Sequence, residues 1–445
     1  MNKIIASIST PLGRGAISII RMSGEGCQNV AKKVFSSSLL DWNNITPNRL
    51  YLGFFQFDDG LKERCFQVYF KSPHSYTGED MIEYQVHGGV LLTQKVLSTL
   101  LENGATLASP GEFSKRAFEN GKISLDEAES IIGEINAESE GELKASLMSA
   151  SGALKDKVML LQENLTAQIA EIEATLDYPE EDFEKSAKEK IFSSVQNVKN
   201  EIDDLVKQAQ NARFINKGIN IAIVGAPNVG KSSLLNEFVG QEKAIVTDIA
   251  GTTRDIVSEQ IFYKGLKFNF VDTAGIRDAI DKVEKIGVEK SKEAISSADI
   301  VLFVLDGSEV LSKEDEKIFN IIKSLPHIVI INKSDKTRKM KTFEDEIVVS
   351  AVEKKGIEEV KEKVYQKVIK EEIDFSKTVV INERQVAILG ECGQIANDIM
   401  QAKEESMDII AMLIKKLWNS LGKITGQCEN EKIIELIFSK FCLGK

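Results

Sequence analysis

The chain contains few of the residues that cross-link small secreted proteins or bind transition metals. Its 445 residues include five cysteines and three histidines. The cysteines are scattered, odd in number and form no C-x-x-C pair; they are Cys27, Cys65, Cys392, Cys428 and Cys442. Neither a disulfide framework nor a zinc site is therefore expected.

Long apolar runs are missing as well. No run reaches the roughly 18 apolar residues that a membrane-spanning helix needs. Pro11 and Arg14 interrupt the N-terminal stretch before an apolar core can form. Cys442 stands where prenylation would need it, but Gly444 and Lys445 fit that signal badly. We expect a cytoplasmic protein without a membrane anchor.

An excess of positive charge is also absent. The net charge of −12 argues against a broad basic surface for nucleic-acid backbones, so any contact with RNA must be local or shared with a partner. With 445 residues, 42% of them hydrophobic, the chain can fill two or three cores, and we expect several domains.

The second half of the chain contains five short segments in an order typical of guanine-nucleotide pockets. They are Gly225-Ala226-Pro227-Asn228-Val229-Gly230-Lys231-Ser232, Gly251-Thr252-Thr253-Arg254-Asp255, Asp272-Thr273-Ala274-Gly275, Asn332-Lys333-Ser334-Asp335 and Ser350-Ala351. The first follows an apolar run and precedes a helical stretch, which is the context of a phosphate-binding loop. One such match could arise by chance, but all of them in order predict a GTPase domain.

The segments supply residues with distinct chemical roles. Backbone N–H groups of the first loop can face phosphates, Lys231 can reach the β and γ oxygens, and Ser232 offers Mg²⁺ a hydroxyl. Thr253 is the expected second metal hydroxyl, and Asp272 can hold the metal's water shell. The carboxylate oxygens of Asp335 match the N1–H and N2–H₂ donors of guanine, so GTP should be preferred over ATP.

The predicted nucleotide contacts extend over all of these segments. They are Asn228, Val229, Gly230, Lys231, Ser232, Ser233, Thr247, Asp248, Ile249, Ala250, Gly251, Thr252, Thr253, Asp272, Thr273, Ala274, Gly275, Asn332, Lys333, Asp335, Ser350, Ala351 and Val352. Directly after Gly275, where Ras-type GTPases have a water-positioning glutamine, this chain has Ile276. Since an alkyl group cannot orient water, hydrolysis must depend on another residue and another positive charge.

Hydrophobic periodicity divides the chain into regions. Residues 1 to about 118 mix short alternating strands with one helical stretch and indicate an α/β or α+β unit. An apolar stripe then predicts long helices that face a bundle core and end near Asp177-Tyr178-Pro179; its members are Leu143, Leu147, Ala150, Leu154, Val158, Leu161, Leu165, Ile169, Ile172 and Leu176. A second stripe comprises Ile410, Ile414, Leu417, Leu421 and Ile424. Between them, apolar runs predict a doubly wound, largely parallel sheet with the nucleotide at its C-terminal edge.

Further distinctive segments lie inside and outside the nucleotide-binding region. They are Thr10-Pro11-Leu12-Gly13-Arg14-Gly15, Tyr76-Thr77-Gly78-Glu79-Asp80, His87-Gly88-Gly89, Pro110-Gly111-Glu112-Phe113, Thr247-Asp248-Ile249-Ala250, Ile276-Arg277, Val283-Glu284-Lys285-Ile286-Gly287 and Phe441-Cys442-Leu443-Gly444-Lys445. Together with the segments above, they make the chain resemble one family over essentially its whole length, the tRNA modification GTPases called MnmE or TrmE. This resemblance implies a multidomain chain of α/β and all-α classes. A tetrahydrofolate-binding and dimerisation domain would occupy 1–118, a helical bundle 119–216 and 376–445, and an inserted Ras-like P-loop G domain 217–375.

The resemblance also implies how hydrolysis proceeds without a glutamine. G domains of two subunits pair across their nucleotides, and a K⁺ ion beside the phosphates replaces an arginine finger. The K⁺ ligands would be Asn228 through its side chain and Thr247, Ile249 and Thr252 mainly through backbone oxygens. Glu284 matches the residue that orients or activates the attacking water, joining Lys231 in catalysis. From its charge-rich surroundings alone, Glu284 would be interpreted as a solvated helix charge.

In the family, the N-terminal domain binds a reduced folate, in a 5,10-methylene or 5-formyl form, and holds a homodimer together. Matching positions are Arg21, Glu83 and Lys122, with Lys445 nearby. A carboxylate can accept hydrogen bonds from the pterin edge, and cations can meet the ligand's carboxylates. From the sequence alone, each of these residues is an ordinary surface charge.

The resemblance thus implies a homodimeric, K⁺-activated GTPase that acts with the flavoprotein MnmG (GidA). Together they would install a carboxymethylaminomethyl or aminomethyl group on C5 of wobble uridine in tRNA, with the folate supplying the one-carbon unit. Cys442 would act as a nucleophile or protect an intermediate. Its alternative interpretation is a packed residue at a helix end.

Two other functions stay open from the residues. An Era- or Der-type ribosome-assembly GTPase would share the phosphate loop and the Asn332-Lys333-Ser334-Asp335 segment, but it would need an RNA-binding appendage such as a KH domain, which we do not find. A folate-dependent aminomethyltransferase relative, whose GTPase only reports occupancy, predicts that hydrolysis-dead variants still modify tRNA.

Overall fold

The computed structural model describes residues 3–177, 181–240, 257–271, 295, 298–369, 373–375 and 382–445. They form two compact units. One comprises Met1–Ile135, Ser149–Glu201 and Ile388–Lys445, and the other comprises Asn136–Met148 and Ile202–Ala387. In sequence, the second unit is therefore inserted into the first.

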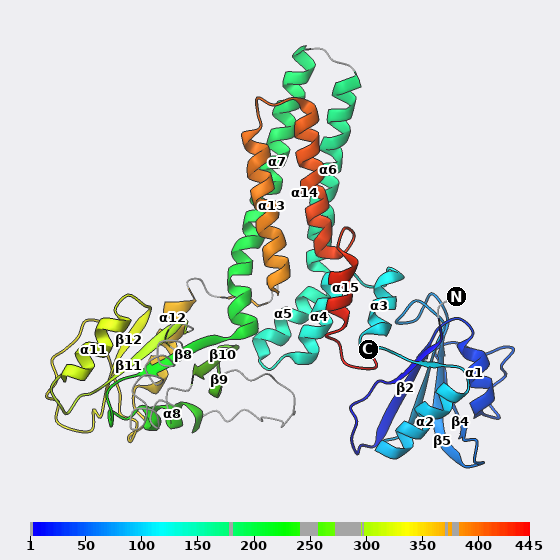
Figure 1. Ribbon diagram of the computed structural model, residues 1–445, viewed down its shortest axis with the longest axis horizontal. Coiled ribbons are helices and arrows are strands. Elements are labelled where there is room, and N and C mark those ends of the chain that lie inside the picture. The colour runs from blue at the N-terminus through cyan, green and yellow to red at the C-terminus, as the bar shows by residue number, and fades with distance from the viewer. Residues whose placement is uncertain are drawn as a thin grey trace. The chain divides into compact units, whose positions relative to one another are not determined.

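The first unit contains a mainly antiparallel sheet. Its strands are β1 (Ile5–Ile8), β2 (Ile17–Ser23), β3 (Phe35–Ser36), β4 (Leu50–Gln56), β5 (Lys62–Phe70), β6 (Met81–His87) and β7 (Thr106–Leu107). Within the described part of the chain their order is β3–β4–β5–β6–β2–β1–β7, and β7 pairs parallel to β1. Helices α1 (Cys27–Val34) and α2 (Val90–Glu102) cover one face, where Ile20, Tyr84 and Val96 share a buried core (Figure 1). This arrangement confirms the α+β prediction.

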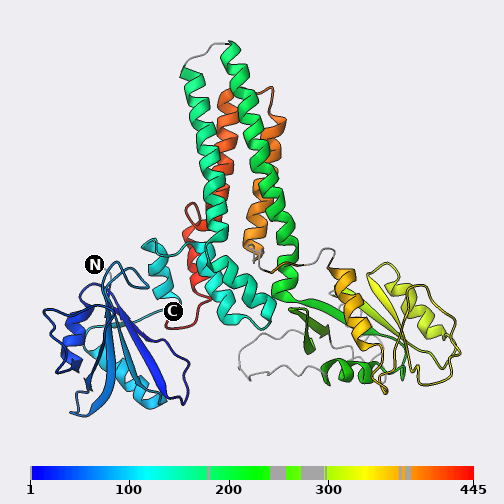
Figure 2. The ribbon, with the colours of Figure 1, turned by 180° about the vertical axis from the view of Figure 1, so that it is seen from behind.

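The rest of the first unit is helical. It comprises α3 (Glu112–Glu119), α4 (Leu125–Asn136), α6 (Ala153–Asp177), the N-terminal half of α7 (Glu181–Lys217), most of α13 (Glu383–Gln401), α14 (Met407–Thr425) and α15 (Glu431–Phe438). Helices α6, α7, α13 and α14 lie side by side in both views of the chain (Figures 1 and 2). The second stripe is confirmed, since all of its members on α14 are fully buried: Ile410, Ile414, Leu417, Leu421 and Ile424. Helix α6 ends at Asp177, as predicted, whereas Pro179 lies outside the described residues.

The first stripe is confirmed only in its middle. Leu154, Val158, Leu161, Leu165 and Ile172 are buried, but the prediction of a core-facing side chain is wrong at both ends of the stripe. Leu143, Leu147 and Leu176 are exposed by 41%, 52% and 42%. The physical reason for the first two is a break at Gly152, which separates α5 (Glu140–Ala150) from α6 with a φ of 83°.

The early part of α5 belongs to the second unit. Ala145 lies in that unit's core, and Gly141 N donates to Gly265 O at 3.1 Å. The Glu142 carboxylate accepts from the Glu138 backbone N at 2.7 Å and meets Lys267 Nζ at 2.6 Å. These contacts fix the start of α5 on the sheet of the second unit.

The second unit has helices on both faces of a largely parallel sheet. Its strands are β8 (Ile219–Val224), β9 (Val257–Tyr263), β10 (Leu266–Val271), β11 (Ile300–Asp306), β12 (His327–Asn332) and β13 (Ile347–Val348). Over the described ranges their order is β13–β12–β11–β8–β10–β9, with β9 antiparallel to β10. Helices α8 (Lys231–Gly240) and α12 (Ile357–Val368) pack on one core and α11 (Lys313–Ile322) on the other. The predicted doubly wound fold is confirmed.

Parallel pairing brings the C-terminal ends of β8, β11 and β12 to one edge of this sheet. That edge is where open α/β sheets bind ligands. In the described part of the chain, no helix is both long and apolar enough to cross a bilayer.

Candidate functional site

The loop between β8 and α8 adopts the backbone conformation of a phosphate-binding turn. Asn228 and Gly230 both have positive φ angles, 63° and 99°. A Cβ on Gly230 would lie 2.3 Å from Asn332 Nδ2, so glycine is required there for close approach. The loop ends at Lys231, the first residue of α8, which places a helix N-terminus at the site.

Lys231 is turned back onto its own loop. Its Nζ donates to Gly225 O at 2.7 Å and to Ala226 O at 2.8 Å. Ser232 and Ser233 follow in the first turn of α8 and are exposed. An ammonium group, a helix N-terminus and exposed hydroxyls suit an anionic phosphate chain with a hard cation such as Mg²⁺.

The segments at the ends of β12 and β13 converge on this loop. Asn332 Nδ2 donates to Val229 O at 2.9 Å, and Asn332 Oδ1 accepts from Ala351 N at 3.3 Å. The buried Ser350 donates its hydroxyl to Asp335 Oδ1 at 2.7 Å, which lowers the pKa of Asp335 and keeps it ionised. The structure therefore brings together three of the five predicted segments.

Lys333 joins the base segment to the phosphate loop. Its Nζ donates to Asn228 O at 2.9 Å and meets Asp306 Oδ2 at 2.5 Å. The sequence-based prediction missed Asp306, although a carboxylate at the end of the apolar run 300–305 is a visible signal. Val352, also predicted to contact nucleotide, is 81% exposed.

The remaining predicted nucleotide and ion residues lie outside the described residues. They are Thr247, Asp248, Ile249, Ala250, Gly251, Thr252, Thr253, Asp272, Thr273, Ala274, Gly275 and Glu284. The predicted K⁺ ligand set is therefore represented in the structure by Asn228.

In the first unit, two of the predicted folate residues form an ion pair. Arg21 on β2 lies opposite Glu83 on β6, and Arg21 Nε donates to Glu83 Oε1 at 2.8 Å. The guanidinium carbon is 5.3 Å from the Tyr76 ring centroid and 5.7 Å from that of Phe113. Lys122 is not part of this pair, because its Nζ donates to Pro73 O at 3.0 Å.

The C-terminal segment lies against the start of the same sheet. Ser9 Oγ donates to Gly444 O at 3.1 Å, and Lys445 N donates to Cys442 O. Cys442 is exposed. By contrast, burial raises the thiol pKa to about 12 at each of three other cysteines: Cys27, Cys65 and Cys392.

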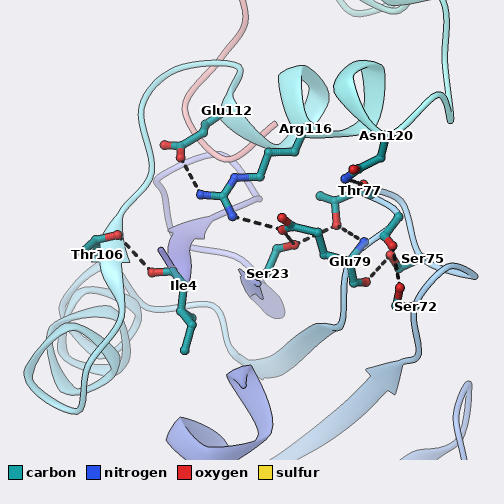
Figure 3. A network of polar contacts seen from close by, with 11 residues as sticks. Ile4, Ser23, Ser72, Ser75, Thr77, Glu79, Thr106, Glu112, Arg116 and Asn120 are labelled. Carbon is teal, nitrogen blue, oxygen red and sulfur yellow. Dashed lines mark hydrogen bonds and ion pairs between the residues drawn. The ribbon is translucent and has the colours of Figure 1, made fainter. Parts of the chain in front are cut away.

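A polar network holds the loop that contains Tyr76-Thr77-Gly78-Glu79-Asp80 (Figure 3). Glu79 accepts from Ser23 Oγ at 2.9 Å and from Arg116 at 3.0 Å. Arg116 also donates to Glu112 at 2.8 Å. Motif residues that carried the resemblance thus connect α3 to the sheet beside the Arg21–Glu83 pair.

Comparisons with known proteins cover the whole chain. Residues 125–442 match the family model described as MnmE helical domain, and residues 4–122 match the one described as GTP-binding protein TrmE N-terminus. A tRNA modification GTPase MnmE from Clostridioides difficile is 40% identical over 456 residues, covering 99% of both chains. The Aquifex aeolicus protein of that name is 38% identical over 453 residues, covering 100% of both.

Some solved structures resemble the chain more distantly. Aquifex aeolicus Era bound to GDP and aluminium fluoride is 25% identical to this chain, covers 42% of it and 69% of Era, and has a TM-score of 0.26. A likeness this low carries no argument about function.

The resemblance seen in the motifs is confirmed by family models and by relatives of matching length. A third relative, from Lactobacillus johnsonii, is 38% identical over 99% of this chain and 98% of its own. The chain belongs to the MnmE (TrmE) family of tRNA modification GTPases.

Proposed function

We propose that this chain is a GTP hydrolase that acts in tRNA modification. One observation supports the nucleotide assignment above all. Asn332 and Lys333 donate to backbone carbonyls of the loop at 225–230, and Ala351 N donates to Asn332 Oδ1. The role in tRNA modification is supported by the names of the full-length relatives.

The chain's own residues suggest how binding proceeds. Lys231 would exchange its two loop carbonyls for phosphate oxygens, which carry full charge and form stronger hydrogen bonds. Asp335, kept ionised by Ser350, would accept the two guanine donors. Ser232 and Thr253 would hold Mg²⁺, which neutralises charge on the β and γ oxygens when bound.

We further propose that K⁺ activates hydrolysis. Asn228, Thr247, Ile249 and Thr252 would hold the ion, which supplies the positive charge that an arginine finger provides elsewhere. Glu284 would orient the attacking water in place of the glutamine that Ile276 replaces.

The reaction on tRNA would need a second protein and a one-carbon donor. We propose MnmG as the partner and a tetrahydrofolate derivative as the donor, with modification at C5 of wobble uridine. Arg21 and Glu83 would exchange their mutual ion pair for the folate's polar groups. Lys122 and Lys445 would complete this site, and Cys442 would act as a nucleophile or protect an intermediate.

The test compares initial rates of GTP hydrolysis by the purified full-length chain in K⁺ and in Na⁺, with Glu284→Ala alongside. We expect faster turnover in K⁺ and loss of most turnover in Glu284→Ala with nucleotide affinity unchanged. Glu316→Ala, which removes an exposed carboxylate on α11, serves as the matched control and should behave like the unmodified chain.

Equal rates in the two salts would remove K⁺ from the mechanism, and normal turnover in Glu284→Ala would refute its role. Nucleoside analysis of wobble uridine in cells that carry only Glu284→Ala completes the test. Full modification there would favour a GTPase that only reports folate occupancy.

A further inference from the structure

Asp306 stands beside the guanine-recognition segment without belonging to any nucleotide motif. It is the last residue of β11 and lies directly opposite Asn332 in β12. Its side chain is 13% exposed, and that of its neighbour Lys333 is 26% exposed. This carboxylate is therefore mostly shielded from water at the edge where the nucleotide would bind.

The two oxygens of Asp306 have different partners. Oδ1 accepts from Ser308 N at 2.9 Å and from Ser308 Oγ at 2.7 Å. Oδ2 accepts a hydrogen bond from Lys333 Nζ at 2.5 Å. Burial by itself raises the pKa of Asp306, but the hydrogen bonds from Lys333 and Ser308 outweigh it and lower the pKa below its usual value. The carboxylate is thus charged at neutral pH.

Lys333 also contacts the phosphate loop. Its Nζ donates to Asn228 O at 2.9 Å. Both residues have left-handed backbone conformations, with φ of 64° at Lys333 and 63° at Asn228. Non-glycine residues adopt this region at a cost, so surrounding contacts must hold them there.

We propose that Asp306 is a positioning residue for nucleotide binding, which holds Lys333 against the phosphate loop and through it fixes Asn228. This inference rests on the proposed function. A long, flexible lysine side chain keeps one geometry only when its ammonium has a fixed counter-charge. Asp306 supplies that charge, and Ser308 fixes the orientation of Asp306.

The alternative without a role in binding is that Asp306 and Lys333 form an ion pair that only stabilises the edge of the sheet. The chain offers a matched pair for comparison. Arg338 and Glu346 form an ion pair at 2.6 Å, also in the segments that follow β12, and Arg338 bonds to Met340 O and Lys341 O rather than to the phosphate loop. Breaking this pair tests for general stability effects alone.

The experiment measures binding of a fluorescent GDP analogue to the full-length chain with Mg²⁺, as Kd and dissociation rate. The variants are Asp306→Ala, Asp306→Asn, Lys333→Ala, the Asp306→Ala/Lys333→Ala double variant and Arg338→Ala. Thermal unfolding without nucleotide and the KM and kcat for GTP are recorded for each. Asp306→Asn keeps the shape and one acceptor, so it remains informative if Asp306→Ala fails to fold.

We expect Asp306→Ala to raise Kd and the dissociation rate by about ten- to a hundredfold, with a similar rise in KM and little change in kcat. Asp306→Asn should fall between it and the unmodified chain. The double variant should be no worse than Lys333→Ala, since Asp306 acts through that lysine. Arg338→Ala should change the unfolding temperature alone.

The inference is overturned if Asp306→Ala binds within about twofold of the unmodified chain, or if Asp306→Ala still weakens binding in the Lys333→Ala background. An equal loss of affinity in Arg338→Ala would also overturn it. If the unmodified chain itself does not bind the guanine nucleotide, the proposed function fails instead.

Discussion

At the scale of single residues, Asp126 stands out as a buried acid near the start of α4. It is fully buried, its Oδ1 accepts from Ser124 Oγ at 2.6 Å, and its Oδ2 has no hydrogen-bond partner among the described residues. Burial is the main cause that raises its pKa from 3.8 to about 6. A charged carboxylate is therefore disfavoured in the folded state.

The raised pKa predicts a pH-dependent stability. Between about pH 4 and pH 6 the folded chain binds the proton more tightly than the unfolded chain, so stability should fall as pH rises through that window. By linkage the loss amounts to about 3 kcal/mol above pH 6. Asp126→Asn should therefore raise the unfolding temperature at pH 7.5 and change it little at pH 4.

The matched control is Asp156→Asn, which alters an exposed acid in the first turn of α6. It should shift the unfolding temperature little at either pH. A gain for Asp126→Asn that is equal at pH 4 and pH 7.5 would contradict the linkage argument.

The sequence could predict part of the nucleotide site because its residues are local in the chain. The loop at 225–232 needs only a strand, glycines and a helix start, and all of these are visible in the sequence. The contact of Lys333 with Asp306 depends instead on the register of β11 and β12, which pairs Asp306 with Asn332. No residue pattern gives that register, so the contact between Asp306 and Lys333 was missed.

At the scale of elements, glycines allow α15 and the C-terminal segment to approach the N-terminal domain. Gly111, just before α3, has a φ of 70°, and a Cβ there would lie 2.1 Å from Phe438 O at the end of α15. A Cβ on Gly444 would meet Ile8 O at the same distance. These close approaches give a physical reason for glycine in two of the family motifs.

Gly111→Ala should destabilise the chain more than a substitution with backbone strain alone. Gly60 has a similar φ of 81° but open space around its Cβ position, so Gly60→Ala isolates the backbone term, about 1–2 kcal/mol. Gly111→Ala adds a steric clash with backbone, for which we expect about 1–3 kcal/mol more. Denaturant unfolding of both variants measures the difference, and equal losses would contradict the close-approach argument.

Helix α5 shows why periodicity alone could not assign elements to units. Leu143 and Leu147 continue the apolar stripe of α6 in the sequence, yet they are exposed. The contacts that assign the start of α5 to the second unit are made by small residues. Ala145 lies in the core of that unit, and Gly141 bonds to Gly265. Small residues contribute little to a hydrophobic pattern, so this packing could not be predicted from periodicity.

At the scale of the whole molecule, the face of the N-terminal sheet opposite α1 and α2 exposes apolar side chains. Ile17, Leu50, Phe54 and Phe66 are exposed there by 61%, 51%, 46% and 41%. These side chains come from β2, β4 and β5, whereas α1 and α2 pack on the opposite face. Exposed apolar patches of this kind commonly mark interfaces, which supports the homodimer that the family resemblance implies.

The dimer proposal leads to a prediction about this face. The double substitution Phe54→Glu/Phe66→Glu should convert the dimer to a monomer, because it would place four charges in a symmetric apolar interface, two from each chain. The unfolding temperature of the monomeric unit should change little, since both rings are already partly exposed. Leu91→Glu on α2, which alters a side chain exposed by 81%, is the control and should leave the mass unchanged. The measurement is the molar mass from light scattering after size exclusion. If the double variant is still a dimer, the interface does not lie on this face. If the unmodified chain is a monomer, the dimer itself is refuted.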